Sequence, residues 1–165
     1  MNTIQITRAL ENNKVTRNVF RGVFAADNLP TSETLPAAYV ANRSNAADAG
    51  SHWVAFYREI PNVIKVWDSY EKPLEFYNAN LLTTVPSGTS IMQQSQQLQQ
   101  TGSTVCSQYC LFFILKRALR VSYKQLIHLF TDNLMVNDKV VCQYVNNYFK
   151  LNTPAYDKAM TVGAV

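Results

Sequence analysis

Charged residues and long apolar runs are both scarce in this 165-residue chain. Only 16% of its residues are charged, and 15 Lys and Arg against 11 Asp and Glu give a formal net charge of +4. No basic run marks a dedicated nucleic-acid-binding arm, so we interpret most of this charge as solvating surface, with contact to a polyanion left open. No stretch approaches the ~18 apolar residues of a membrane helix, and the start does not resemble a signal peptide. We therefore expect a soluble protein with no membrane partner.

Cysteine is also scarce, and its odd number argues against a framework of disulfides. Three cysteines in a chain that is 47% hydrophobic indicate free thiols in a reducing compartment. The two histidines, taken together with Cys106 and Cys110, have no recognisable zinc-ligand spacing. The sequence therefore gives no reason to expect a metal or other cofactor. The length suits one core rather than two. We predict a single domain over 1–165, with 152–165 as a loosely held tail.

Apolar periodicity predicts both helices and strands. A short helix over 3–12 would bury Ile4, Ala9 and Leu10, and most of the glutamine-rich segment 91–104 would be an exposed connection. Ser122 and Asn137 are the predicted N-caps of the last two helices. The other predicted elements are an extended segment at 18–30, adjacent antiparallel strands at 35–44 and 52–60, a third strand at 62–70, a buried helix at 105–120 and helices at 122–132 and 137–150.

Cys106 is the candidate nucleophile, because it lies where a polar turn gives way to the apolar helix. The positive end of the helix dipole and its unpaired N–H groups lower the pKa of a thiol. A nucleophilic thiol also needs a base and an acid that orients the base. His52 begins one predicted strand and Asp68 ends the next, so antiparallel pairing brings both to one rim of the sheet. By contrast, His128 is predicted to be packed or at the surface, and Cys110 and Cys142 to be core sulfur.

Acyl transfer also needs hydrogen-bond donors for the developing oxyanion. The backbone N–H of Cys106 is one donor. A side-chain amide from the glutamine tract is a natural second, and Gln99 is our choice, with Gln100 and Gln97 as alternatives.

The order His52, Asp68, Gln99, Cys106 resembles that of the adenain-like cysteine proteases. This family includes the adenovirus maturation protease and relatives in virus-like transposons (Polinton/Maverick elements), with the SUMO-deconjugating enzymes more distantly related. The resemblance runs from Phe20 to Leu115 and lies in the blocks "FRGVFAADNLP", "YVAN", "GSHWVAFY", "VWDSYEKPL" and "STVCSQYCLFFIL".

The resemblance implies an α+β fold in which the cysteine helix packs on a mainly antiparallel central sheet. It implies Cys106 as nucleophile, His52 as general base, Asp68 as orienting acid and Gln99 as oxyanion donor. Members of the family favour small residues, often glycine, before the cut, and Trp53 would help to wall that subsite; a core aromatic is the other interpretation of Trp53.

Three features depart from the family pattern. Ser107 follows the nucleophile where glycine is usual, and Gln99 is followed by Gln100 rather than by glycine. The adenovirus enzyme is activated by DNA and by a disulfide-linked peptide, but no cysteine precedes Cys106 here. A disulfide-tethered activator is therefore not supported, while DNA or a peptide stays open as an activator.

These observations predict a cysteine endopeptidase that cuts viral or virus-like capsid precursors during virion maturation. It would act as a monomer in the virion or inside the host cell, in the nucleus or cytoplasm. Two alternatives stay open: a protease that removes ubiquitin-like modifiers such as SUMO, and an inactive protease-like scaffold that binds peptide or nucleic acid.

Overall fold

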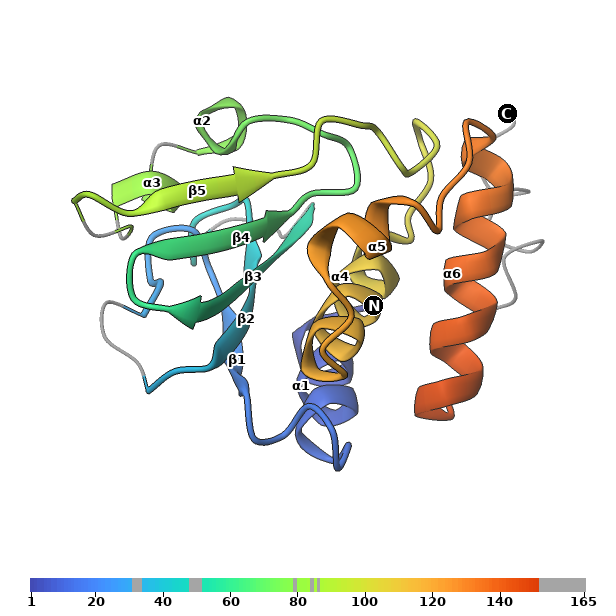
Figure 1. Ribbon diagram of the computed structural model, residues 1–165, viewed down its shortest axis with the longest axis horizontal. Helices are drawn as coiled ribbons and strands as arrows, with labels where there is room; N and C mark the ends of the chain where they lie inside the picture. Colours follow the sequence, from blue (N-terminus) through green and yellow to red (C-terminus); the bar gives the residue numbers. More distant parts are fainter. Residues whose placement is uncertain (31–33, 48–51, 79, 84, 86, 152–165) are drawn as a thin grey trace.

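The chain forms an α+β fold around one five-stranded sheet (Figure 1). The computed structural model describes residues 1–30, 34–47, 52–78, 80–83, 85 and 87–151, so the predicted tail at 152–165 lies outside the described residues. In chain order the elements are α1 (Thr3–Glu11), β1 (Phe20–Phe24), β2 (Ala37–Asn42), β3 (Trp53–Ile60), β4 (Val63–Trp67), α2 (Leu74–Tyr77), α3 (Asn80–Thr83), β5 (Ser90–Gln93), α4 (Cys106–Ala118), α5 (Tyr123–Ile127) and α6 (Leu134–Phe149).

The sheet is mixed, so the expectation of a mainly antiparallel sheet is wrong. Its strands lie in the order β1-β2-β3-β4-β5. The central strands β2, β3 and β4 pair antiparallel, but β1 pairs parallel with β2 and β4 pairs parallel with β5. A parallel pair needs a connection that carries the chain back to the starting end. The segment 25–36 does this for β1 and β2, and the segment with α2 and α3 does it for β4 and β5.

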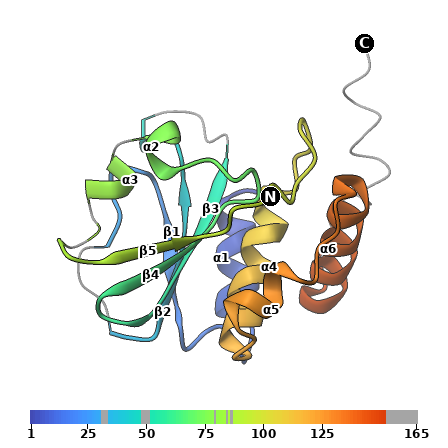
Figure 2. The same ribbon diagram turned by 45° about the horizontal axis from the view of Figure 1, so that its top comes forward.

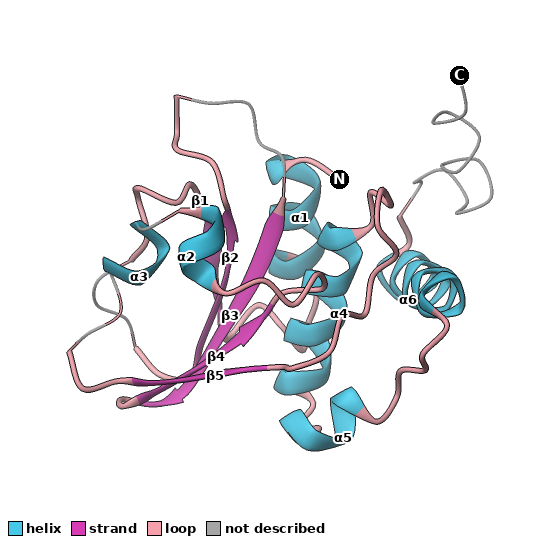
Figure 3. Cartoon of the chain, turned by 90° about the horizontal axis from the view of Figure 1, so that it is seen from above, coloured by secondary structure: helices cyan, strands magenta, loops and turns pink. Residues whose placement is uncertain are grey.

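Helices α1 and α4 cover one face of the sheet, and α6 packs on the outer side of α4 (Figure 3). Apolar side chains from the strands and the helices make up this layer. Its buried members include Ile6, Leu10, Val40, Ala55, Tyr57, Trp67, Tyr109, Phe113, Val141 and Val145. In α1 the apolar face differs in one position from the prediction, because Ile6 is buried with Ala9 and Leu10 whereas Ile4 is 59% exposed.

The short helices α2 and α3 help to cover the opposite face of the sheet. Leu74 of α2 and Leu81 of α3 pack there against side chains from the central strands, among them Phe56 and Val66. Because the central strands are buried on both faces, β2 is a continuous buried run rather than an alternating one.

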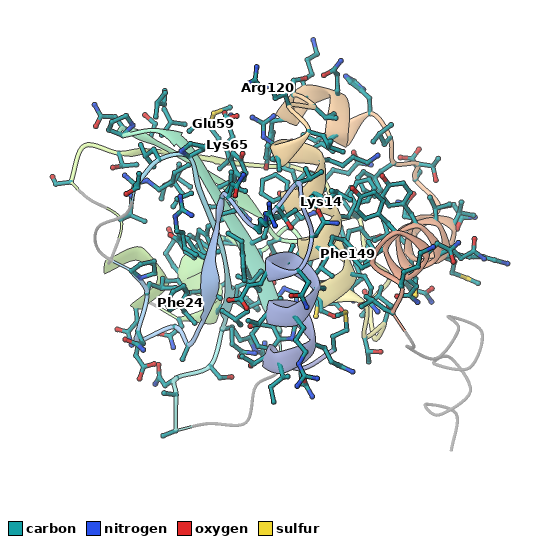
Figure 4. The ribbon with its side chains drawn as sticks, turned by 90° about the horizontal axis from the view of Figure 1, so that it is seen from below. Lys14, Phe24, Glu59, Lys65, Arg120 and Phe149 are labelled. Atoms are coloured by element: carbon teal, nitrogen blue, oxygen red, sulfur yellow. The ribbon has the colours of Figure 1, made fainter. Side chains whose placement is uncertain are left out.

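Helix α4 is the centre of the fold and begins at Cys106, as the apolar pattern predicted. Phe113 of this helix is fully buried, and its ring stacks on Trp67 of β4 with the centroids 5.0 Å apart. Nearer the end of the helix, Arg117 donates to Glu59 of β3 at 2.5 Å, and Lys65 of β4 pairs with the same carboxylate; Figure 4 labels Glu59 and Lys65 close together. Stacking and ion pairing thus join α4 to the middle of the sheet.

Three local predictions are corrected by the structure. Segment 91–104 is an exposed connection only in part: its first residues belong to β5, and Gln94, Leu98 and Gln99 are buried. The helix predicted at 122–132 extends only over Tyr123–Ile127, although Ser122 is its N-cap as predicted. The N-cap of α6 is Asn133 and not Asn137.

Asn137 has a different function from the predicted capping. Asn137 lies in the first turn of α6, and its side chain reaches the segment before the helix, where it donates to the Thr131 carbonyl at 2.8 Å and accepts from the Thr131 N–H at 2.9 Å. A third hydrogen bond, from the Asn137 amide to the Leu98 carbonyl at 3.3 Å, joins the helix to the segment that precedes α4.

None of the helices within the described part of the chain combines the length and the apolar character that crossing a membrane requires.

Replacing Phe113 with Ala should destabilise the protein by about 3–5 kcal/mol, because it removes a fully buried ring and leaves a cavity against Trp67. The free energy of unfolding from a urea titration measures this effect. The matched control is Phe76→Ala, which removes the same ring from a side chain that is 65% exposed and should cost less than about 0.5 kcal/mol. Equal losses in the two variants would contradict the assignment of Phe113 to the core.

Candidate active site

Antiparallel pairing of β3 and β4 brings His52 and Asp68 together. Trp67, the last residue of β4, lies opposite Ala55, so Asp68 follows at the edge where His52 precedes β3. The Nε2 atom of His52 lies 2.7 Å from Oδ1 of Asp68, and both side chains are buried.

The carboxylate of Asp68 is fully buried and accepts four hydrogen bonds. Besides the His52 ring, its Oδ1 accepts from the Tyr70 N–H at 3.1 Å. Its Oδ2 accepts from the Lys72 N–H at 2.7 Å and from the Tyr77 hydroxyl at 2.8 Å. A buried carboxylate needs such partners because it has lost its water, and together they set the plane in which it meets the imidazole.

Cys106 is the first residue of α4, and its thiol hydrogen-bonds to the ring of His52. Because Nε2 of His52 bonds to Asp68, we assign the contact with the sulfur to the other ring nitrogen, Nδ1. A hydrogen bond with the Trp53 backbone also reaches the thiol. The sulfur, imidazole and carboxylate therefore form one continuous hydrogen-bonded chain at the N-terminal end of the central helix.

The pKa values of Cys106 and His52 move in the directions that favour a thiolate–imidazolium pair. Burial by itself would raise the pKa of Cys106, but the hydrogen bond and charge of His52 outweigh burial and lower it. Burial would likewise lower the pKa of His52, yet hydrogen bonds with Asp68 and Cys106 raise it from 6.5 to about 9. Such a pair can attack a carbonyl with the thiolate and protonate a leaving amine from the ring.

Gln99 lies beside this chain, in the segment that leads into α4. Its side chain is fully buried, and its Oε1 accepts from the Ser69 hydroxyl at 2.6 Å. Its Nε2 donates to the Ser103 carbonyl at 2.7 Å and to the Tyr70 hydroxyl at 3.0 Å. Both N–H groups thus have protein acceptors, and donation to a substrate oxygen requires exchange of one of them.

The alternative glutamines are placed differently. The Gln97 side chain donates to the Gln99 carbonyl at 2.8 Å, a hydrogen bond within the same segment. Gln100 uses its backbone N–H, which lies 3.3 Å from Asp138 of α6.

Trp53 is half-buried and borders a cavity between the start of α1 and the ends of β1 and β2. Its indole N–H donates to the Met1 carbonyl at 3.2 Å, and the Met1 amino group lies 3.3 Å from the Ser107 hydroxyl, so the start of the chain lies beside the start of α4 (Figure 2). The cavity has a volume of about 530 Å³, and its lining is rich in asparagine and small side chains. Ser107 itself is fully buried and donates to Gln108 at 2.8 Å.

The other candidate groups lie elsewhere. His128 is exposed and caps the C-terminal end of α5. Cys110 and Cys142 are buried free thiols, and burial raises the pKa of each. Among the residues with described positions, no cluster of three or more His, Cys, Asp or Glu side chains could hold a metal ion.

Sequence reasoning overlooked several residues that contact the predicted ones. Ser69 and Tyr70 directly follow Asp68, so the aspartate block itself gave a signal for them. Gln94 donates through its side chain to the Asp68 carbonyl, and Tyr77 donates to the Asp68 carboxylate. Nothing in the sequence marks these last two residues, because only the path of the chain after β4 brings them back.

No family model matches the chain, and no curated protein does. One solved structure that it is similar to is the crystal structure of the selenomethionine form of the ASFV pS273R protease, with a TM-score of 0.40 and 21% identity over 63% of this chain. The match covers 43% of that protease, so this chain spans less than half of its length.

Proposed function

We propose that this chain is a cysteine endopeptidase with Cys106 as nucleophile, His52 as general acid and base and Asp68 as the residue that orients the base. The observation that carries the proposal is the buried hydrogen-bonded chain from the Cys106 thiol through the His52 ring to the Asp68 carboxylate. A buried thiol, imidazole and carboxylate connected in this order have the pattern of a covalent acyl-transfer centre.

The reaction follows from that order. The Cys106 thiolate attacks the carbonyl carbon of the scissile peptide, and the C–N bond breaks as His52 gives its proton to the departing amine. Water then attacks the thioester while His52 takes a proton from it, and the acid and the free thiolate are released. The Cys106 N–H at the start of α4 and an N–H of Gln99 are the proposed donors to the oxyanion.

The proposed substrates are capsid precursor proteins cut after small residues. The cavity beside Trp53 supports an extended peptide as the ligand, because its amide side chains suit the N–H and C=O groups of a main chain. Trp53, the next residue after His52, would wall the path to the thiol and exclude large side chains just before the cut. The assignment to capsid precursors comes from the resemblance to adenain-like proteases.

Replacing Cys106 with Ala should lower the cleavage rate of such a precursor by more than about 10⁴-fold, because it removes the nucleophile. Gel analysis of the precursor over time measures the rate. Cys142→Ala is the matched control and should cleave like the wild type. Equal cleavage by the Cys106 and Cys142 variants would refute the proposal.

The three candidate glutamines can be separated by alanine substitution. Gln99→Ala should lower kcat by about 10²–10³-fold, the effect of losing one oxyanion donor, whereas Gln97→Ala and Gln100→Ala should retain most of the activity. Steady-state kinetics on a fluorogenic peptide measure these values. A larger loss in either neighbour than in Gln99→Ala would move the donor assignment to that neighbour.

The opposite pKa shifts of Cys106 and His52 make the stability of the folded protein depend on pH. The lowered pKa of Cys106 means that its thiolate contributes stability above the ordinary thiol pKa and loses it as the pH falls through the lowered value. The raised pKa of His52 means that its proton contributes stability below 6.5 and loses it as the pH rises through about 9.

At pH 7, iodoacetamide should therefore alkylate Cys106 at least about 10-fold faster than Cys110 or Cys142, whose pKa values are raised. Mass spectrometry of tryptic peptides gives the three rates. In His52→Ala this preference should disappear, and its survival there would disprove the ion pair.

A further inference from the structure

Tyr77 contacts both partners of the proposed His52–Asp68 pair. It is the last residue of α2, and its hydroxyl donates to Oδ2 of Asp68 at 2.8 Å. Its ring packs on the His52 imidazole with centroids 5.0 Å apart and planes tilted by 35°. Of the four donors to Asp68, two are backbone N–H groups of the turn that follows it, and two are the side chains of His52 and Tyr77.

The fold holds Tyr77 in this place from several sides. Leu74, one turn earlier in α2, is buried on the far face of the sheet, and its carbonyl accepts from the Asn78 N–H at 3.2 Å. The Arg43 guanidinium lies 5.9 Å from the centre of the Tyr77 ring. Burial and the charge of Asp68 raise the pKa of the Tyr77 hydroxyl, so it stays a donor over the whole working range of pH.

Tyr70 provides an internal comparison. Its ring also packs on His52, at 5.0 Å and 32°, but its hydroxyl points to the Ser103 carbonyl at 2.7 Å and accepts from Gln99. The two tyrosines therefore share the stacking contact with the imidazole, whereas the hydroxyl contact with the Asp68 carboxylate belongs to Tyr77.

We infer that Tyr77 is a positioning residue of the proposed active site: its hydroxyl fixes the rotation of the Asp68 carboxylate, and its ring fixes the plane of the His52 imidazole. Without the hydroxyl, Oδ2 keeps the backbone N–H of Lys72 but loses its side-chain anchor, and the carboxylate can turn away from His52. The effect of Tyr77 on catalysis rests on the proposed function, whereas its effect on the His52–Asp68 pair does not.

Among the residues that the structure describes, the titratable groups that face His52 are Asp68, Cys106, Tyr70 and Tyr77, and Arg43 lies beyond the Tyr77 ring. In Tyr77→Phe, weaker contact with Asp68 should lower the pKa of His52 from about 9 toward its ordinary 6.5, and the pKa of Cys106 should rise in turn. Because a hydrogen bond to a charged group is involved, alkylation of Cys106 at pH 7 should slow by roughly 10-fold. Peptide cleavage should lose a similar factor in kcat, with KM within about twofold.

The test compares Tyr77→Phe with three reference variants. Asp68→Asn should shift the alkylation profile in the same direction and further. Tyr70→Phe should leave the pH profile of alkylation in place, because its hydroxyl contacts Gln99 and Ser103 rather than Asp68. Tyr148→Phe, on the exposed side of α6, should behave like the wild type in every measurement. All rates are measured below the melting temperature of the least stable variant.

NMR titration of the His52 ring gives a second readout that needs neither cleavage nor alkylation. A lowered His52 pKa in Tyr77→Phe supports the inference. An unchanged His52 pKa and alkylation profile overturn it, even if the variant melts at a lower temperature, because Tyr77 would then only stabilise α2. If the wild type alkylates selectively at Cys106 but cleaves no peptide, the endopeptidase proposal fails, and the titration still decides the position of Tyr77.

Discussion

The burial of the Asp68 carboxylate is the constraint on which the candidate site depends. Burying a carboxylate away from water is costly unless hydrogen-bond donors surround it. Here the donors come from His52, which immediately precedes β3, from the turn after β4 and from α2. The same contacts therefore determine how the strand ends, the turn and the short helix sit together. A change at Asp68 would disturb the site and the local packing at once.

The central helix connects this carboxylate to the thiol. Cys106 is at the N-terminal end of α4, and about two turns further along the helix Phe113 stacks on Trp67 of β4. Since Trp67 immediately precedes Asp68, the packing that anchors α4 to the sheet also sets how far the sulfur lies from the histidine–aspartate pair. Core and site are thus parts of one packing arrangement.

The segment between β5 and α4 shows why composition alone can mislead. Its run of glutamines is typical of an exposed connection, yet Gln94 and Gln99 are buried. The Gln94 amide donates to the Asp68 carbonyl, and the Gln99 amide accepts from the Ser69 hydroxyl. Their amides satisfy backbone and hydroxyl groups that would otherwise be buried without a partner. At these two positions glutamine is a buried hydrogen-bonding residue, so the polarity of its side chain does not indicate that it is exposed to solvent.

The sequence by itself determined the local features: the apolar helix that begins at Cys106, the strands that carry His52 before one and Asp68 after the next, and the N-cap at Ser122. These depend on periodicity and on neighbours along the chain. The tertiary structure alone decided the parallel pairing of β1 with β2 and of β5 with β4, the burial of Gln99 and the contact of Tyr77 with Asp68. Each of these features brings together segments that are far apart in the sequence. Whether such segments meet depends on the route of the connections between them, and a local sequence pattern does not specify that route.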